Sequence, residues 1–203
     1  MRILLTAFEP YDDWTQNSSW LALIALLRDR PGNMELVTRR YPVGLAELKK
    51  QLDKDLDADF DVVIHTGQAP GAATVKLEAI ALNAAGVIEQ AGECVSPLVS
   101  DAPVGYRSEL PIAGCLDALR AANVPSAVSY HAGTFLCNAA LFLSQHWFAT
   151  RGLSTKVGFI HLPLASEQIA TSGPLLPSLP TETLAQALRV VLETLAENPQ
   201  RLA

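Results

Sequence analysis

Residues 60–66, which read FDVVIHT, decide the fold of this chain. The stretch is short, apolar and rich in β-branched residues, and Gly67 closes it, so the pattern predicts a buried β-strand. Strands of this kind are typical of parallel sheets that helices cover on both faces. We therefore expect the rest of the chain to supply further parallel strands and the helices that cover them.

The alternation of strands and helices continues in both directions along the chain. Short apolar runs predict extended segments, and longer periodic patterns predict helices between them. The expected extended segments are residues 2–7, 34–40, 74–83, 125–130 and 155–161. The expected helices are residues 18–27, 44–56, 111–122, 134–150 and 180–197. Residues 86–109 are expected to form loops or a hairpin, and residues 172–180 a surface connection. The pattern predicts an α/β fold with a mostly parallel sheet.

The composition excludes several classes of protein. A hydrophobic fraction of 49% and a net charge of only −6 exclude a chain dominated by disorder. An excess of 21 Asp+Glu over 15 Lys+Arg disfavours nucleic-acid binding through bulk electrostatics. No apolar run approaches the roughly 18 residues of a membrane span. We expect one domain, residues 1–203, with neither a nucleic-acid nor a membrane partner.

The first residues and the cysteines indicate where the protein works. The apolar run at residues 3–5 leads straight into residues 6–10, TAFEP, without a small-residue cleavage site, so it predicts a strand and not a signal peptide. The three cysteines, Cys94, Cys115 and Cys137, are odd in number and share no CxxC spacing. This disfavours both a disulfide framework and a zinc site. We expect a cytoplasmic protein with free thiols, no metal and no cofactor.

Three places in the sequence follow predicted parallel strands directly, at the edge of the sheet where α/β proteins bind their ligands. These are residues 8–11 (FEPY), residues 67–71 (GQAPG) and residues 161–163 (HLP). The GQAPG segment has neither the lysine of a phosphate-binding P-loop nor the GxGxxG spacing of a dinucleotide site. On its own it is equally consistent with an ordinary turn.

Cys137 lies in the first turn of the helix that follows Gly133 and Thr134. The positive end of a helix dipole favours a thiolate there. A small buried apolar side chain is the alternative, and spacing alone leaves both open. For Cys94, in a loop-like stretch, and Cys115, on a mid-helix apolar stripe, the structural role is favoured.

His161 and Glu78 are the candidates for a base and its partner. His161 ends a strong strand at the functional edge of the sheet, although a hydrogen-bonded core histidine would give the same pattern. Residues two apart in a strand share a face, which places Glu78 with Ile80 and Leu82. A carboxylate on such a face requires a cation or donors. The alternative is a register in which Glu78 faces solvent.

Together Cys137, His161 and Glu78 form a possible nucleophile, base and orienting carboxylate. In such a set a thiolate attacks a carbonyl, the imidazole moves the proton to the leaving amine, and the acid holds the imidazole tautomer. Any α/β chain with a few cysteines and histidines yields such a triple, so the residues alone leave it as a hypothesis.

Four segments also carry longer motifs. They are residues 3–11 (ILLTAFEPY) with 17–19 (NSS), residues 67–69 (GQA) with Glu78 and Asn83, residues 129–138 (SYHAGTFLCN), and residues 158–163 (GFIHLP) with Gln168. They resemble the patterns TGFEPFGG…NPS, GQAGG…ERVAIN, SxxAGTYVCN and GFIHVP…Q of pyroglutamyl peptidase I, or pyrrolidone-carboxylate peptidase, a family of cysteine peptidases. The match extends over most of the chain, and the order and spacing of the last two motifs are specific.

The resemblance implies a cysteine exopeptidase that hydrolyses the amide bond after an N-terminal pyroglutamyl (5-oxoprolyl) residue of small peptides. It also implies a homotetramer in the cytoplasm that needs no metal. The implied fold is a three-layer α/β/α sandwich of the phosphorylase/hydrolase-like type, with a twisted, mostly parallel sheet.

The family's functional residues fall on particular positions of this chain. Its catalytic Glu, Cys and His match Glu78, Cys137 and His161. Its lactam ring is held by aromatic or apolar side chains and by main-chain groups near the GQA turn. The matching positions are Phe8, Tyr11, Gln68 and Leu136.

The sequence departs from the family pattern beside the expected pocket. Asp12 and Asp13 replace two glycines, Ala79 replaces the arginine after the catalytic Glu, and residues 84–90 (AAGVIEQ) lack the arginine of DDAR(I/F)PDN. Two alternatives follow from these departures. One is a paralogous amidase with altered acyl specificity, and the other is a catalytically silent member that acts as a binding or assembly protein.

Overall fold

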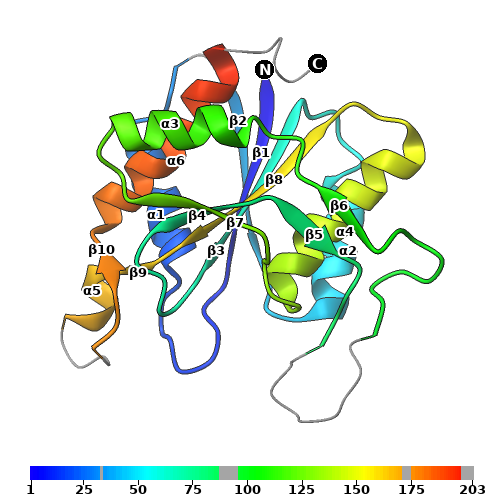
Figure 1. The fold of residues 1–203 in the computed structure, drawn as a ribbon, viewed down its shortest axis with the longest axis horizontal. Helices are drawn as coiled ribbons and strands as arrows, with labels where there is room; N and C mark the ends of the chain where they lie inside the picture. Colours follow the sequence, from blue (N-terminus) through cyan, green and yellow to red (C-terminus); the bar gives the residue numbers. More distant parts are fainter. Residues whose placement is uncertain (33, 87–95, 171–174, 198–203) are drawn as a thin grey trace.

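A twisted central sheet runs through the protein with helices on both of its faces (Figure 1). The computed structural model describes residues 1–32, 34–86, 96–170 and 175–197. Within these ranges, six strands form the sheet in the order β2-β1-β3-β8-β4-β7. They are β1 (Arg2–Phe8), β2 (Glu35–Tyr41), β3 (Val62–Gln68), β4 (Val75–Glu78), β7 (Ser126–Ser129) and β8 (Lys156–Leu162). The pairs are parallel except β4–β8, which is antiparallel, so the predicted α/β fold with a mostly parallel sheet is confirmed.

The helices divide between the two faces of the sheet. Against one face pack α1 (Ser18–Arg28), α3 (Ile112–Ala121) and α6 (Thr181–Glu197), and against the other pack α2 (Leu45–Asp55) and α4 (Leu136–Arg151). Strand β1 contributes side chains to both apolar layers. Ile3 and Leu5 pack in the layer with α1, α3 and α6, and Leu4 and Phe8 pack in the layer with α2 and α4. No helix in the described ranges is both long and apolar enough to span a membrane.

The expected extended segment 74–83 is two strands in two different sheets. It breaks at Ala79, whose N–H donates to Ser129 O and whose carbonyl accepts from Ser108 N. β5 (Ile80–Leu82) then pairs antiparallel with β6 (Gly105–Arg107), away from the central sheet. The expectation that Glu78 shares a face with Ile80 and Leu82 is therefore wrong, although Glu78 is buried for another reason.

Three short elements near residues 164–179 escaped the sequence patterns. β9 (Leu164–Ala165) pairs parallel with β10 (Ser178–Leu179), and α5 (Ser166–Ile169) follows β9 directly. Two-residue strands and a single helical turn are too short to show periodicity. The predicted surface connection 172–180 thus contains a strand, and its residues 172–174 lie outside the described ranges.

Candidate active site

Glu78, Cys137 and His161 meet where β3, β4 and β8 face the start of α4. Gly67 and His161 are register partners on the parallel strands β3 and β8. Antiparallel pairing puts Lys76 of β4 opposite His161, so Glu78 is a diagonal neighbour of His161 on the same face. The pairing of strands therefore explains why a carboxylate from β4 reaches a histidine from β8.

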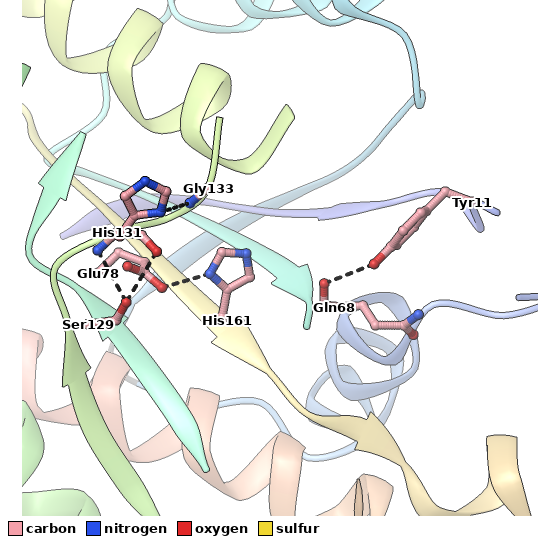
Figure 2. A network of polar contacts seen from close by, with 7 residues as sticks. All are labelled: Tyr11, Gln68, Glu78, Ser129, His131, Gly133 and His161. Atoms are coloured by element: carbon pink, nitrogen blue, oxygen red, sulfur yellow. Dashed lines mark hydrogen bonds and ion pairs between the residues drawn. The ribbon is translucent and has the colours of Figure 1, made fainter. Parts of the chain in front are cut away.

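His161 and Glu78 form a buried hydrogen-bonded pair (Figure 2). The distance from His161 Nδ1 to Glu78 Oε1 is 2.7 Å, and the two residues are 8% and 1% exposed. This excludes the alternative in which Glu78 faces solvent. Within the described part of the chain, Glu78 Oε2 has no hydrogen-bond partner. A carboxylate on Nδ1 favours the tautomer that leaves Nε2 free for another group.

Cys137 is the second residue of α4, in its first turn as the sequence predicted. Its sulfur lies against the backbone of β3: a Cβ atom added at Gly67 would be 2.9 Å from Cys137 Sγ and 2.8 Å from Phe159 Cζ. Real Cβ atoms do not approach other atoms so closely, so the absence of a side chain at position 67 makes room for the thiol.

The charges of the site act on His161. Burial lowers the pKa of its ring, but the negative charge of Cys137, a hydrogen bond to Cys137 and the Glu78 carboxylate outweigh it and raise the pKa to about 9. At neutral pH the imidazolium is therefore the favoured form of His161.

Cys137 also forms part of the wall of an apolar cavity of about 160 Å³. All four residues that the family motifs assigned to substrate binding line the same cavity. They are Phe8, Tyr11, Gln68 and Leu136. Among the described residues, none that lines the cavity is charged. The cavity thus suits a small neutral group whose reactive carbon reaches the sulfur.

The whole sequence fits one family of peptidases. A family model for pyroglutamyl peptidases (Peptidase_C15) matches residues 1–198. The chain belongs to the pyroglutamyl peptidase family. It is 36% identical to pyrrolidone-carboxylate peptidase of Thermococcus onnurineus over 199 residues, which cover 96% of this chain and 98% of that protein. It is also 36% identical to pyrrolidone-carboxylate peptidase 1 of Ralstonia nicotianae, over 95% of this chain and 91% of that protein.

Solved structures of such peptidases share the fold. The crystal structure of pyrrolidone carboxyl peptidase from Fervidobacterium islandicum superposes with a TM-score of 0.88 at 29% identity, covering 97% of this chain and 99% of that one. A mutant of the Pyrococcus furiosus protein gives a TM-score of 0.85 at 32% identity, over 98% and 99% of the two chains.

In this pyroglutamyl peptidase family member, Tyr11 lines the cavity and lies well apart from Glu78 (Figure 2). Its hydroxyl donates to the main-chain oxygen of Gln68 at 3.3 Å. Burial, together with the negative charge of Cys137, raises the pKa of Tyr11 to about 12, so the hydroxyl keeps its proton. The following Asp12 stands where the family motif has glycine, and its φ of 55° is the left-handed conformation that aspartate tolerates.

The Gln68 side chain bonds to groups of α1 and α5, whereas its main-chain oxygen accepts from Tyr11 (Figure 2). Its Oε1 accepts hydrogen bonds from Ser18 N and from Gln168 Nε2, both at 2.8 Å. Gln168 also holds the Ala165 N–H through its own oxygen. The motif residues Gln68 and Gln168 thus join β3, α1 and α5 at the site.

His131 holds the loop that leads into α4. Its Nδ1 accepts a hydrogen bond from Gly133 N at 3.0 Å, and Gly133 has a φ of 79°. Figure 2 places this loop beside Glu78 and His161.

Five cavity residues were not among the predicted binding residues. They are Asn17, Val43, Ala132, Gly133 and Phe135. Four of these lie within or beside the quoted motifs, which could have identified them. Val43 lies between β2 and α2 and carries no signal of its own, since only the folded chain brings it to the cavity.

Cys115, the other cysteine that the structure describes, is separate from this site. Cys115 is buried in α3, and burial raises the pKa of its thiol to about 11. Cys94 lies outside the described residues. In the ranges that the structure describes, no group of three or more His, Cys, Asp or Glu side chains could hold a metal ion.

Proposed function

We propose that this protein is a cysteine exopeptidase that hydrolyses the amide bond after an N-terminal pyroglutamyl residue. One observation carries the proposal: Cys137 is both a wall of the apolar cavity and the neighbour of the buried His161–Glu78 pair. A carbonyl at the end of a group in the cavity would therefore meet a nucleophile that already has its acid and its orienting carboxylate.

The residues divide the reaction into two steps. The Cys137 sulfur attacks the carbonyl carbon, and His161 gives its proton to the leaving nitrogen as the amide bond breaks and a thioester forms. The peptide leaves with a free amine. Water then attacks the thioester carbon, and His161 takes a proton from the water. The C–S bond breaks, pyroglutamate departs, and the thiolate beside the protonated His161 is restored. Glu78 holds the imidazole through Nδ1 in both steps.

The start of α4 supplies the electrostatic part of the mechanism. The tetrahedral intermediate carries a negative oxygen, which main-chain N–H groups stabilise well. The Cys137 N–H lies in the first helical turn, where N–H groups have no carbonyl of the same helix to bind. The preceding N-cap residue, Phe135, has no polar side chain to occupy them. We assign the Cys137 N–H to the oxyanion.

The cavity accounts for the choice of a pyroglutamyl group. A pyroglutamyl residue in amide linkage carries neither a free amine nor a charge. The lining offers the aromatic and aliphatic surfaces of Phe8, Tyr11 and Leu136, without charged groups among the described residues. An ordinary N-terminal residue would bring an ammonium group into this cavity and lose its hydration without gaining a carboxylate.

A second candidate function is that of a paralogous amidase for another small acyl group. Two observations favour it: the positive φ of Asp12, and Ala79 at the position of the family's arginine. A fluorogenic pyroglutamyl amide, compared with acetyl and prolyl amides, separates the two. Turnover of the pyroglutamyl amide that disappears in Cys137→Ala supports the proposal. Turnover of another acyl amide alone supports the second candidate, and no turnover of any amide supports a silent binding protein.

We extend the proposal to a homotetramer that works in the reducing cytoplasm. The support is the family to which the chain belongs and the need of a catalytic thiol to stay reduced. Light scattering on the purified protein tests the assembly, where a mass of four chains is expected and a monomer would contradict it.

A further inference from the structure

His65 is a buried histidine for which the proposed reaction has no use. It lies in the middle of β3 and is 0% exposed. Its Nδ1 is 2.8 Å from Thr6 Oγ1 on β1, and its Nε2 is 2.9 Å from Ser144 Oγ on α4. Burial lowers the pKa of the ring to about 3, so the ring is neutral at physiological pH and takes no part in proton transfer.

Strand β3 and helix α4 also contact each other at a second point, where Cys137, the proposed nucleophile, approaches Gly67. Gly67 follows His65 by two residues and points to the same face of β3. Cys137 precedes Ser144 by seven residues, which is close to two helical turns, so both side chains lie on one face of α4. The hydrogen bond from His65 to Ser144 and the approach of Cys137 Sγ to Gly67 are therefore two contacts of one β3–α4 interface.

The two contacts differ in how strictly they fix the helix. Apolar side chains tolerate small sliding and rotation at an interface, whereas a hydrogen bond weakens steeply with changes in distance and angle. A shift of α4 would also leave the imidazole and the hydroxyl buried without partners, which is unfavourable. Phe159 packs between His65 and the site. The centroid of its ring is 6.4 Å from the centroid of the His65 ring and 4.6 Å from that of the His161 ring.

We propose that His65 is a positioning residue, which through Ser144 and Thr6 fixes α4 against the sheet so that the Cys137 sulfur lies against Gly67 and beside His161. This inference rests on the proposed function, since it gives His65 a role in placing the nucleophile. It adds a residue from outside the cavity, two turns of helix away from the sulfur, to the groups that set the rate.

The test compares variants that remove the hydrogen bond with one that removes a different buried bond. Ser144→Ala removes one partner. The pair His65→Leu with Ser144→Ala removes both partners of this bond and so avoids an unpaired imidazole, which provides a second variant if the single variant fails to fold. Thr66→Val is the matched control. Thr66 is next to His65 on β3, and its hydroxyl donates a different buried hydrogen bond, to Thr6 O on β1. Circular dichroism and thermal unfolding confirm that each variant is folded.

Two rates are measured: hydrolysis of a pyroglutamyl amide, and alkylation of Cys137 by iodoacetamide, followed by mass spectrometry of the peptide that contains it. We expect kcat of the double variant to fall by about tenfold to a hundredfold while KM stays nearly unchanged. Alkylation of Cys137 should become slower, and its dependence on pH should shift to higher pH. Thr66→Val should lose stability and keep both rates.

A folded double variant that is alkylated and turns over like the wild type would overturn the inference, and so would an equal loss of rate in Thr66→Val. A wild-type protein that hydrolyses no pyroglutamyl amide would refute the proposed function instead. The alkylation rates would still decide the role of His65 in that case.

Discussion

Two glycines on neighbouring strands, Gly67 of β3 and Gly158 of β8, leave gaps on opposite faces of the central sheet. A Cβ atom at Gly158 would collide with the side chain of Leu110, which belongs to the apolar layer beneath α1, α3 and α6. A Cβ atom at Gly67 would collide with the sulfur of Cys137 and the ring of Phe159, on the face that α2 and α4 cover. The same device therefore accommodates a packing residue on one face and the proposed nucleophile on the other.

The two faces also differ in their buried polar groups. On the α4 face, His65 bonds to Thr6 and Ser144, and Glu78 bonds to His161, so buried side chains bond to one another. The opposite face combines apolar side chains such as Leu5 and Ile64 with buried polar groups such as Thr66, which bonds to a main-chain oxygen. Buried polar groups that are hydrogen-bonded restrict a structure to one arrangement more strictly than apolar packing does. We infer that the α4 face fixes the reactive groups and that the opposite face supplies mainly apolar stability.

The largest difference between the faces should appear in their thiols. Cys137→Ala should reduce hydrolysis of a pyroglutamyl amide to background without unfolding the chain, because it removes the thiol that forms the proposed thioester. Cys115→Ala, on the apolar face, should keep full turnover and lose only some stability. Activity assays and thermal unfolding of the two variants check this, and an active Cys137→Ala enzyme would remove the nucleophile from the account.

Glu78→Gln should have the next largest effect. We expect kcat to fall roughly a hundredfold with little change in KM, because the imidazolium loses its charged partner in the transition state. The wild-type rate should decline as the pH rises through about 9, where His161 loses the proton that the leaving nitrogen needs. Without the Glu78 charge, one of the causes that raise the pKa of His161 is gone, so the decline should begin at lower pH. An unchanged pH–rate profile would separate Glu78 from His161.

The two glycines provide the most direct contrast between the faces. Gly67→Ala should lower kcat by about tenfold to a hundredfold, because the added methyl group displaces the sulfur from its place beside His161. Gly158→Ala should cost about 1–3 kcal/mol of stability through overpacking against Leu110 and leave kcat unchanged. Denaturant unfolding and steady-state kinetics on both variants test the pair. An equal fall in kcat in both variants would contradict the inference that the α4 face alone positions the reactive groups.

The change at Tyr11 should affect KM and leave kcat nearly unchanged. Its ring lines the cavity, so Tyr11→Ala should raise KM, with a loss of roughly 1–3 kcal/mol typical of an apolar pocket contact. Tyr11→Phe keeps the ring and removes only the 3.3 Å hydrogen bond to Gln68 O, so its KM should stay near the wild-type value. A Tyr11→Ala enzyme with unchanged KM would mean that the acyl group is held elsewhere.

The strands and helices that position the site could be predicted because their periodicity is local. β3 was identified from its apolar run, and α1 from its periodic pattern. The structure adds the cap of α1, where Asn17 Oδ1 accepts from Ser19 N. The break at Ala79 could not be predicted, because its cause is a pair of hydrogen bonds to Ser129 and Ser108, which are distant in sequence. A single residue that leaves a strand changes the face of everything after it.

The site shows the same limit. Motifs located Cys137, His161 and Glu78, whereas the reason why Glu78 reaches His161 lies in the antiparallel pairing of β4 with β8, which no local pattern encodes. His65 was placed inside a buried strand. Its partner Ser144 is 79 residues away and carries no signal of its own, so their contact becomes visible only in the folded chain.

The central claim, that Cys137 carries the pyroglutamyl group during turnover, is tested most directly by trapping the intermediate. The enzyme is mixed with excess pyroglutamyl amide, quenched in acid within the first turnovers and digested for mass spectrometry. We expect the peptide that contains Cys137 to gain the mass of one pyroglutamyl group, bound as a thioester. The same adduct should be absent in Cys137→Ala. Rapid turnover with the adduct on another residue, or the same turnover in Cys137→Ala, would contradict it.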